Sequence, residues 1–428
     1  MPTTNDILPL TEVFSPDTQE ELAAVVRRAD ESRTPIYPLG GGTSLDFGLV
    51  PKTPGWGLSL ARLNRIVDYP ARDMTITVEA GITMSALAET LAGEGQRLPI
   101  DAPHAGSVTG GGATLGGVVA TNTSGPRRYG CGTIRDYVIG ISAVDGRGVP
   151  FKGGGRVVKN VAGYDFCKLL TGSLGTLAVI TQVTLKLKPL AEAAAFVVCD
   201  VSDLDRAETL LAGLVQSQTT PTAIELLCGP AWNDDAALGS APPRTVARLA
   251  VGLEGTRAEV EWMVEQLSRE WRESGVTTGR AIAVKEEVDG VWQWLTEFPA
   301  DDGPLVFKAP LVLKASVLPS QVCNYCRLLR EIDPGCSIQS HAGNGIVLAR
   351  LAEFTPADSG RVLIAGLQPA ATACGGHVVV LSCVGAAEMT RQAIWGGAGD
   401  DTAVMRAVKQ QFDPHDLLNP GRFVYATR

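Results

Sequence analysis

Two glycine-rich stretches, far apart along the chain, constrain what this sequence can fold into more than any other feature. The first is Pro38-Leu39-Gly40-Gly41-Gly42-Thr43-Ser44-Leu45, directly after an apolar run, and the second extends from Gly110 to Gly117. Because consecutive glycines carry no Cβ, several backbone N–H groups can turn toward one anion, and Thr43 and Ser44 add hydroxyl donors. Together the two stretches predict a cradle for the diphosphate of a nucleotide cofactor.

A glycine triplet taken by itself is more often a flexible turn, so its context has to decide. Neither G-x-G-x-x-G nor G-x-x-x-x-G-K-[ST] occurs in the chain. By motif, the sequence is therefore neither a dinucleotide-binding Rossmann unit nor a P-loop protein.

The length of 428 residues predicts more than one hydrophobic core. The pattern of helices and strands changes after Pro189, so we expect an α+β domain at 1–190, a second α+β domain at 191–400, and a C-terminal segment at 401–428. The net charge of −9 disfavours nucleic acid as a partner. The first residues lack a secretory pattern and no apolar run reaches about 18 residues, which predicts a cytoplasmic chain without a transmembrane segment.

Local patterns predict several elements. Asp17 and Glu20 form a D-x-x-E box that predicts a helix start, and Asp145-Gly146 predicts the turn of a hairpin. The one C-x-x-C pair, Cys323 and Cys326, lies in an amphipathic stretch, which favours packing in a helix. The nine cysteines supply no convincing set of four thiolates for an iron–sulfur cluster.

Four blocks occur in a fixed order along the chain: PLGGGTSL at 38–45, GATLGGVVATNTSGPRRYG at 112–130, KNVAGYDFCKLLTGSLGTLAVIT at 159–181 and FDPHDLLNPGRF at 412–423. In this order they resemble the FAD-linked oxidases of the vanillyl-alcohol oxidase (PCMH-type) family, and within it the FAD-binding subunits of glycolate oxidase, or glycolate dehydrogenase. The resemblance covers nearly the whole chain. It implies a two-lobed PCMH-type FAD-binding domain, an α+β cap domain, and a C-terminal segment that returns to the flavin.

The resemblance also implies which residues bind FAD. The first stretch would wrap the pyrophosphate, the second would begin a helix beside it, a later strand would lie at the adenine, and the C-terminal block would come near the flavin ring. The implied residues are Leu39, Gly40, Gly41, Gly42, Thr43, Ser44, Leu45, Ala113, Thr114, Gly116, Gly117, Thr121, Val179, Ile180, Asn419 and Arg422. Relatives with a covalent flavin place a histidine where this chain has Thr43, so we expect FAD to be dissociable.

A catalytic motif of the family is depleted here. Related 2-hydroxy-acid dehydrogenases carry His-x-Gly-Asp-Gly-Asn-x-His and a later Glu-His-Gly, which bind a divalent metal and supply a base. This chain has His341, then Asn344 in place of the Asp and Leu348 in place of the second His, and no Glu-His-Gly. Since leucine cannot ligate a metal, we expect no metal site, and His341 is the remaining catalytic candidate.

This departure favours an FAD-binding subunit of a 2-hydroxy-acid (glycolate) dehydrogenase complex. By the resemblance, a sister FAD subunit with an intact motif would do the chemistry and an iron–sulfur subunit would carry electrons onward, with peripheral membrane association through those partners possible. Two alternatives stay open: a non-enzymatic structural subunit, and a stand-alone flavin oxidoreductase that needs no metal.

Overall fold

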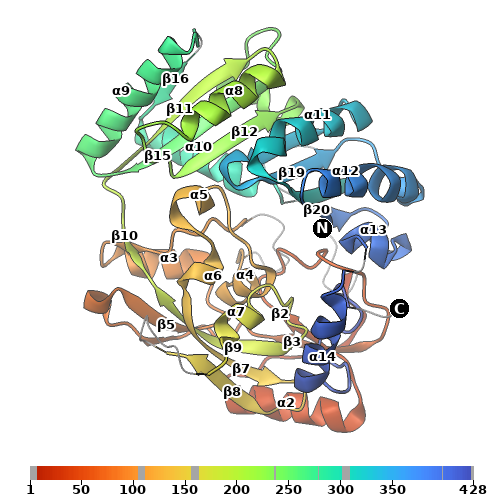
Figure 1. Ribbon diagram of the computed structural model, residues 1–428. Helices are drawn as coiled ribbons and strands as arrows, with labels where there is room; N and C mark the ends of the chain where they lie inside the picture. The colour runs from red at the N-terminus through yellow and green to blue at the C-terminus, as the bar shows by residue number, and fades with distance from the viewer. Residues whose placement is uncertain are drawn as a thin grey trace. The chain divides into compact units, whose positions relative to one another are not determined.

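The chain forms two compact units in the computed structural model, which describes residues 7–104, 111–155, 163–235, 238–277, 279–300, 309–397 and 399–425 (Figure 1). The first unit consists of 1–124, 133–190 and 397–428, and the second of 125–132 and 191–396. The short segment 125–132 therefore groups with the second unit. Two predicted segments lie partly outside the described residues: Gly110, the first residue of the second glycine-rich stretch, and residues 159–162, the start of the block at 159–181.

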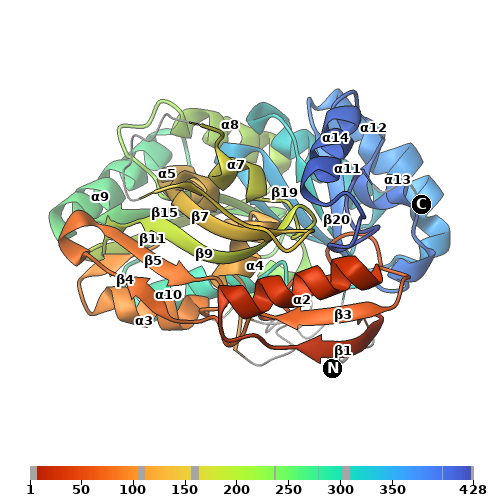
Figure 2. The ribbon, with the colours of Figure 1, turned by 90° about the horizontal axis from the view of Figure 1, so that it is seen from below.

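The first unit contains two main sheets. A parallel sheet has the order β1-β3-β2, and an antiparallel sheet has the order β4-β5-β9-β7-β8. Figure 2 shows β1 and β3 side by side, with α2 near them. The strands are β1 (Leu10–Phe14), β2 (Ile36–Leu39), β3 (Gly55–Ser59), β4 (Ile66–Asp68), β5 (Thr75–Glu79), β7 (Val138–Asp145), β8 (Pro150–Gly154) and β9 (Ala178–Lys186), with β6 (Gln96–Arg97) and β10 (Lys188–Pro189) paired separately. The helices are α2 (Gln19–Ser32), α3 (Met84–Ala92), α4 (Leu115–Thr121), α6 (Ile134–Tyr137), α7 (Phe166–Leu170) and α14 (Thr402–Phe412), with the 3-10 turn η1 (Ala71–Asp73).

Helix α2 begins one residue later than the D-x-x-E pattern predicts. Thr18 has extended backbone angles and its hydroxyl accepts from the Glu21 N–H at 3.1 Å, while the Glu21 carboxylate accepts from the Asp17 N–H at 2.8 Å. The predicted Asp17 and Glu20 box is therefore wrong, because Thr18 and Glu21 satisfy the free N–H groups instead. The hairpin at Asp145-Gly146 is confirmed by the pairing of β7 with β8.

One hydrophobic core joins the helices of the first unit to its antiparallel sheet. Leu22 and Val26 of α2 are buried in it, as are Leu115 and Val119 of α4. Because α4 packs on β9 through this apolar side, its glycine-rich start is held at a fixed place beside that strand.

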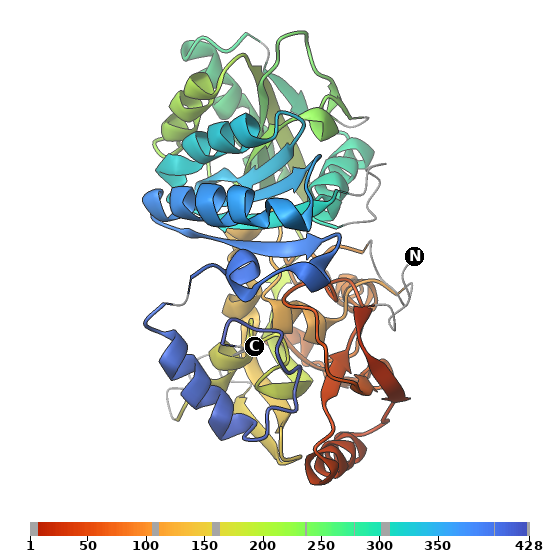
Figure 3. The ribbon, with the colours of Figure 1, turned by 90° about the vertical axis from the view of Figure 1, so that its right-hand side faces the viewer.

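The second unit is built on one antiparallel sheet of eight strands, in the order β16-β11-β15-β12-β18-β19-β17-β20. Helices cover both faces of this sheet, as Figure 3 shows. The strands are β11 (Ala193–Val201), β12 (Ala223–Cys228), β15 (Ala247–Gly255), β16 (Arg280–Ile282), β17 (Leu311–Ser316), β18 (Ser337–His341), β19 (Ile346–Leu351) and β20 (His377–Cys383), besides the small pair β13 (Asp234–Asp235) and β14 (Gly239–Ser240). The helices are α5 (Arg128–Cys131), α8 (Leu204–Leu214), α9 (Arg257–Glu273), α10 (Lys285–Glu297), α11 (Val322–Ile332), α12 (Gln368–Ala373) and α13 (Arg391–Trp395), the π-helix η6 (Gly360–Leu367), and the 3-10 turns η2 (Pro230–Trp232), η3 (Pro319–Gln321), η4 (Ala342–Asn344), η5 (Pro356–Asp358) and η7 (Ala386–Glu388).

The C-x-x-C pair lies on α11, so its predicted use in helix packing is confirmed. Cys323 and Cys326 are both buried and both free thiols. Burial raises the pKa of Cys323 to about 12 and that of Cys326 well above its ordinary value, which keeps both protonated and unreactive. Within the described ranges, none of the helices is long and apolar enough to span a bilayer.

Candidate cofactor and active site

The two glycine-rich stretches touch each other in the first unit. A Cβ on Gly41 would lie 1.8 Å from the carbonyl oxygen of Gly112, and a Cβ on Gly40 would lie 2.4 Å from Oγ1 of Thr114. Gly42 has a φ of +81°, a left-handed conformation that glycine adopts at little cost. The triplet is thus required by close backbone approach and by a turn, and is more than a flexible linker.

These stretches line one cavity, whose volume out to its open mouth is about 1010 Å³. The predicted residues that line it are Gly40, Gly41, Gly42, Thr43, Ser44, Leu45, Ala113, Thr114, Gly116, Gly117, Thr121, Val179, Ile180, Asn419 and Arg422. Leu39 is the one member of the predicted set that does not line it, because it is the last residue of β2, paired with Ser59.

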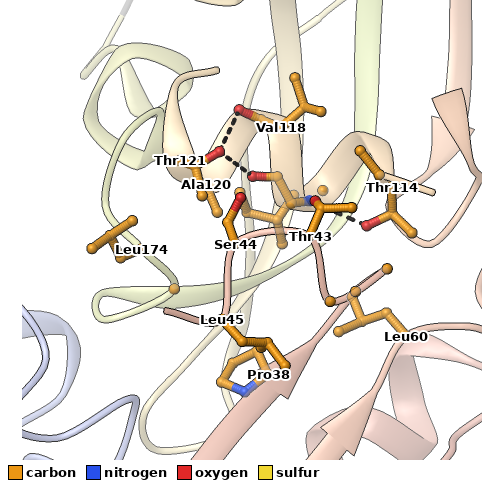
Figure 4. A pocket seen from close by; sticks show the side chains of 18 of the residues that line it. Pro38, Thr43, Ser44, Leu45, Leu60, Thr114, Val118, Ala120, Thr121 and Leu174 are labelled. Carbon is orange, nitrogen blue, oxygen red and sulfur yellow. Dashed lines mark hydrogen bonds between the residues drawn. The ribbon is translucent and has the colours of Figure 1, made fainter. Parts of the chain in front are cut away.

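Helix α4 forms one wall of the cavity. Thr114 caps the helix by accepting from the Gly117 N–H at 3.4 Å, and Thr121 Oγ1 donates to the Gly117 carbonyl at 2.8 Å. The Gly116 N–H donates to the Ala80 carbonyl at 2.7 Å, which fastens α4 to the residue after β5. Figure 4 shows the loop that carries Thr43 and Ser44 lying beside this helix.

The C-terminal segment closes another side of the cavity. The Asn419 amide donates to the Leu174 carbonyl at 2.7 Å, and the Asn419 N–H donates to the Ile36 carbonyl at 2.9 Å. Arg422 donates through Nη2 to the carbonyls of Phe47, at 2.7 Å, and of Leu45. The last block of the sequence is therefore attached both to the first glycine-rich loop and to the loop before β9.

Arg422 is the one charged side chain among the described residues that line the cavity. It is buried, and burial lowers its pKa to about 10, so its charge persists at neutral pH in a place where water does not stabilise it fully. A bound anion such as a phosphate would stabilise that charge.

A buried ion pair holds the C-terminal turn, residues 413–418, in place. The Asp413 carboxylate accepts from the N–H groups of Leu417, at 3.0 Å, and Leu418, at 2.7 Å, and from the ammonium group of Lys409. Lys409 also donates to the Thr176 carbonyl at 2.8 Å. Because Asp413 is 1% exposed, these bonds form away from water and fix the position of Asn419 just beyond them.

His341 belongs to the second unit and does not line this cavity. Its Nδ1 lies 2.8 Å from Oε1 of Glu225, whose other oxygen accepts from Gln339 Nε2 at 3.0 Å. Glu225 and Gln339 are fully buried, and His341 is nearly so. The carboxylate therefore fixes the orientation of the imidazole ring.

Two other positions of the depleted motif no longer carry the metal-binding side chains of the related dehydrogenases. Leu348 is buried in β19, and Asn344, in η4, has a buried Oδ1 without a hydrogen-bond partner. Over the part of the chain that the structure describes, no three His, Cys, Asp or Glu side chains are placed to hold a metal ion.

Sequence reasoning missed several wall residues and the partner of His341. Leu174 and Gly175 line the cavity, and both have positive φ values, of +52° and +63°. The signal was present in Gly-Ser-Leu-Gly, inside a block that was recognised as a whole. Glu225 could have been found as the one acidic residue in an otherwise apolar strand, AIELLC.

Removing the Glu225 carboxylate is expected to destabilise the second unit. Glu225→Ala would leave the buried amide of Gln339 and the His341 ring without their acceptor, at a cost of about 2–3 kcal/mol. Urea unfolding measures this, with Glu261→Ala on exposed α9 as the control. A variant as stable as the control would show that the pair contributes nothing. Flavin content should not change, because the cavity residues belong to the first unit.

Comparisons with known proteins agree with a cavity that binds FAD. Residues 11–153 match the model described as "FAD binding domain", and residues 190–423 match "FAD linked oxidases, C-terminal domain". The glycolate oxidase subunit GlcD of Bacillus subtilis (strain 168) is 25% identical over 96% of this chain and 88% of its own. Glycolate oxidase subunit GlcE of Escherichia coli (strain K12) is 32% identical over 50% of this chain and 58% of its own.

A solved structure supports the fold. Alkyldihydroxyacetonephosphate synthase, at 18% identity, superposes with a TM-score of 0.69 over 95% of this chain and 75% of its own. The glycine cradle, the threonine and serine hydroxyls and the buried Arg422 fit a cofactor that carries a diphosphate. The chain therefore belongs to the FAD-linked oxidases, a family of flavin-dependent oxidoreductases whose cofactor is FAD.

Proposed function

We propose that this chain is the FAD-binding subunit of a complex that dehydrogenates a small 2-hydroxy acid, with glycolate as the first candidate. The observation that carries the proposal is the cavity in which both glycine-rich stretches, α4 and the C-terminal turn meet. Relatives whose names specify subunits of glycolate oxidase support the substrate class and the assembly.

Different residues of the cavity would contact different parts of FAD. The first glycine-rich loop and the start of α4 would contact the pyrophosphate, Arg422 would supply a positive charge, and Val179 and Ile180 would offer an apolar wall. A flavin held by these residues would supply redox chemistry, namely the transfer of electrons within the complex. Thr43 has no imidazole nitrogen with which to bond to the flavin, which supports non-covalent binding.

The depleted motif supports a division of labour. The Nδ1 of His341 is committed to Glu225, and Leu348 has no ligating atom, so this chain lacks the metal and base set of the related dehydrogenases. We therefore propose that a sister flavin subunit with an intact set does the chemistry, and that an iron–sulfur subunit takes the electrons onward.

The test is purification of the native complex through a tag on this chain, followed by flavin quantitation per chain. We expect one FAD per chain, released by acid precipitation, together with two further subunits. A colourless chain that fails to take up added FAD would contradict the proposal. Turnover of glycolate by the isolated chain with an artificial acceptor would contradict the division of labour and favour a stand-alone enzyme.

A further inference from the structure

The chain leaves the first unit and returns to it within a few residues. Residues up to 124 and from 133 to 190 group with the first unit, whereas 125–132, termed the crossing segment, group with the second. The two ends of the crossing segment are held together in the first unit, because the Ile134 N–H donates to Oγ of Ser124 at 3.1 Å. Ile134 is fully buried in the core of that unit. The crossing segment is therefore a short loop whose ends are fixed side by side.

The middle of the crossing segment is attached to the second unit by polar contacts. Nε of Arg127 lies 2.9 Å from Oε1 of Glu254, whose side chain is 4% exposed, and the guanidinium lies 3.7 Å from the centre of the Trp292 ring. The Gly130 N–H donates to the Thr222 carbonyl at 2.9 Å. Since an ion pair and a cation–π contact are stronger away from water, these contacts hold the crossing segment in one position.

Two glycines allow this attachment by leaving room for their neighbours. A Cβ on Gly130 would lie 2.8 Å from the carbonyl oxygen of Pro221 and 2.8 Å from Cα of Thr222, and a Cβ on Gly343 would lie 2.4 Å from the Tyr129 ring. Gly130 itself lies within the short helix α5, a conformation that alanine favours more than glycine does. A methyl group at this position therefore opposes the attached state of the crossing segment and not the detached one.

The base of the crossing segment adjoins the cofactor cavity. Thr121 and Thr123 line that cavity, and their hydroxyl oxygens are 2.7 Å apart. The Thr123 N–H donates to the Val118 carbonyl at 3.1 Å, and only Ser124 separates Thr123 from the crossing segment. The structure describes all of 125–132, and none of these residues lines the cavity. Any effect of the crossing segment on FAD must therefore pass through the chain at its base.

We propose that the crossing segment couples FAD binding in the first unit to the second unit, because it stays attached more firmly when FAD occupies the cavity. FAD in contact with Thr121 and Thr123 orders the chain from which the segment departs, so that attachment then costs less conformational entropy. By thermodynamic linkage, detachment weakens FAD binding by the same factor by which FAD opposes detachment. The inference requires the FAD site alone, and it is independent of the substrate and of the proposed complex.

Limited proteolysis of the wild-type chain tests whether FAD opposes detachment. Arg127 and Arg128 lie in the crossing segment, and trypsin cleaves after them at a rate set by the population of the detached state. We expect saturating FAD to slow the formation of fragments that end at Arg127 or Arg128, identified by mass, by about fivefold or more. Cleavage after Arg244, in an exposed turn of the second unit, is the internal reference and should not change. Equal cleavage of the crossing segment with and without FAD would overturn the proposal.

Two variants test the reverse direction of the coupling. Gly130→Ala opposes attachment by its methyl group, and Arg127→Met removes the contacts with Glu254 and Trp292. Both should raise the Kd for FAD, measured by flavin fluorescence on titration into the flavin-free chain, by up to the protection factor found with trypsin. Gly213→Ala is the matched control, since a Cβ at this position of α8 meets nothing within 4 Å. Wild-type affinity in both crossing-segment variants would contradict the coupling.

The same protease assay separates detachment from general unfolding of a variant. Without FAD, Gly130→Ala should be cleaved faster than the wild type after Arg128 and equally fast after Arg244. Faster cleavage at both sites would show that the contacts serve stability alone, and the inference would fail. Because the FAD protection experiment uses the wild-type chain, it remains decisive even when neither variant folds.

Discussion

Replacing Gly41 with alanine is expected to abolish most flavin binding. The added Cβ would lie 1.8 Å from the carbonyl oxygen of Gly112, so one of the two glycine-rich stretches has to move. Overpacking against backbone costs about 1–3 kcal/mol in stability, and it separates two loops that must meet on the cofactor. We expect the flavin released by acid, measured by absorbance per chain, to fall to about a tenth of the wild-type value or less, a loss equivalent to about 1.4 kcal/mol or more of binding free energy.

Gly93→Ala is the matched control for this substitution. Gly93 lies in the same unit, has a negative φ, and a Cβ there would meet its nearest neighbour at an ordinary 3.4 Å. This variant should keep its full flavin content. If Gly41→Ala also kept it, the two stretches could not be in the contact described here, and the cradle would have to lie elsewhere.

The second large effect is expected at Asp413. Asp413→Asn keeps the shape of the side chain but places an NH₂ group where an oxygen accepts from Leu417, Leu418 or Lys409. It also leaves the Lys409 ammonium, 6% exposed, without its buried partner. Breaking one side of a buried pair costs about 3–5 kcal/mol, so we expect a large loss of stability in urea unfolding together with weaker retention of FAD.

Asp416→Asn provides the comparison, because Asp416 also pairs with Lys409, at 3.1 Å, but is 65% exposed. Asparagine tolerates the left-handed backbone at this position, where φ is +52°. An exposed ion pair contributes about 0–1 kcal/mol, so this variant should unfold close to the wild type. Equal effects of the two substitutions would mean that burial of Asp413 is not what makes it important.

The residues that line the cavity could be predicted from the sequence because four blocks in a fixed order are more specific than any one of them. Gly40 to Gly42 alone would indicate only a turn, and Asn419 and Arg422 were implied by the family resemblance. The sequence of the second unit carried fewer signals of its site. His341 was found through a motif, but Glu225 acquires its meaning only from the pairing of β12 with β18, which joins distant parts of the chain.

The error at the start of α2 comes from competition between neighbouring residues with similar propensities. Thr18 and Asp17 are both good N-cap residues, and the extended angles of Thr18 decide between them. Leu39 lies on the strand side of the β2 boundary, which sequence alone places to within a few residues. The segment 125–132 could not have been placed in the second unit, because its attachment depends on long-range contacts of Arg127 and Gly130.

The return of the C-terminal block to the first unit has a consequence for biosynthesis. Asn419 and Arg422 complete the wall around the first glycine-rich loop, although Arg422 is 375 positions away from Phe47 in the sequence. A nascent chain can fold its sheets before this block is synthesised, but the wall of the cavity is unfinished until the block has left the ribosome. We therefore expect a chain that is truncated before residue 412 to retain FAD poorly.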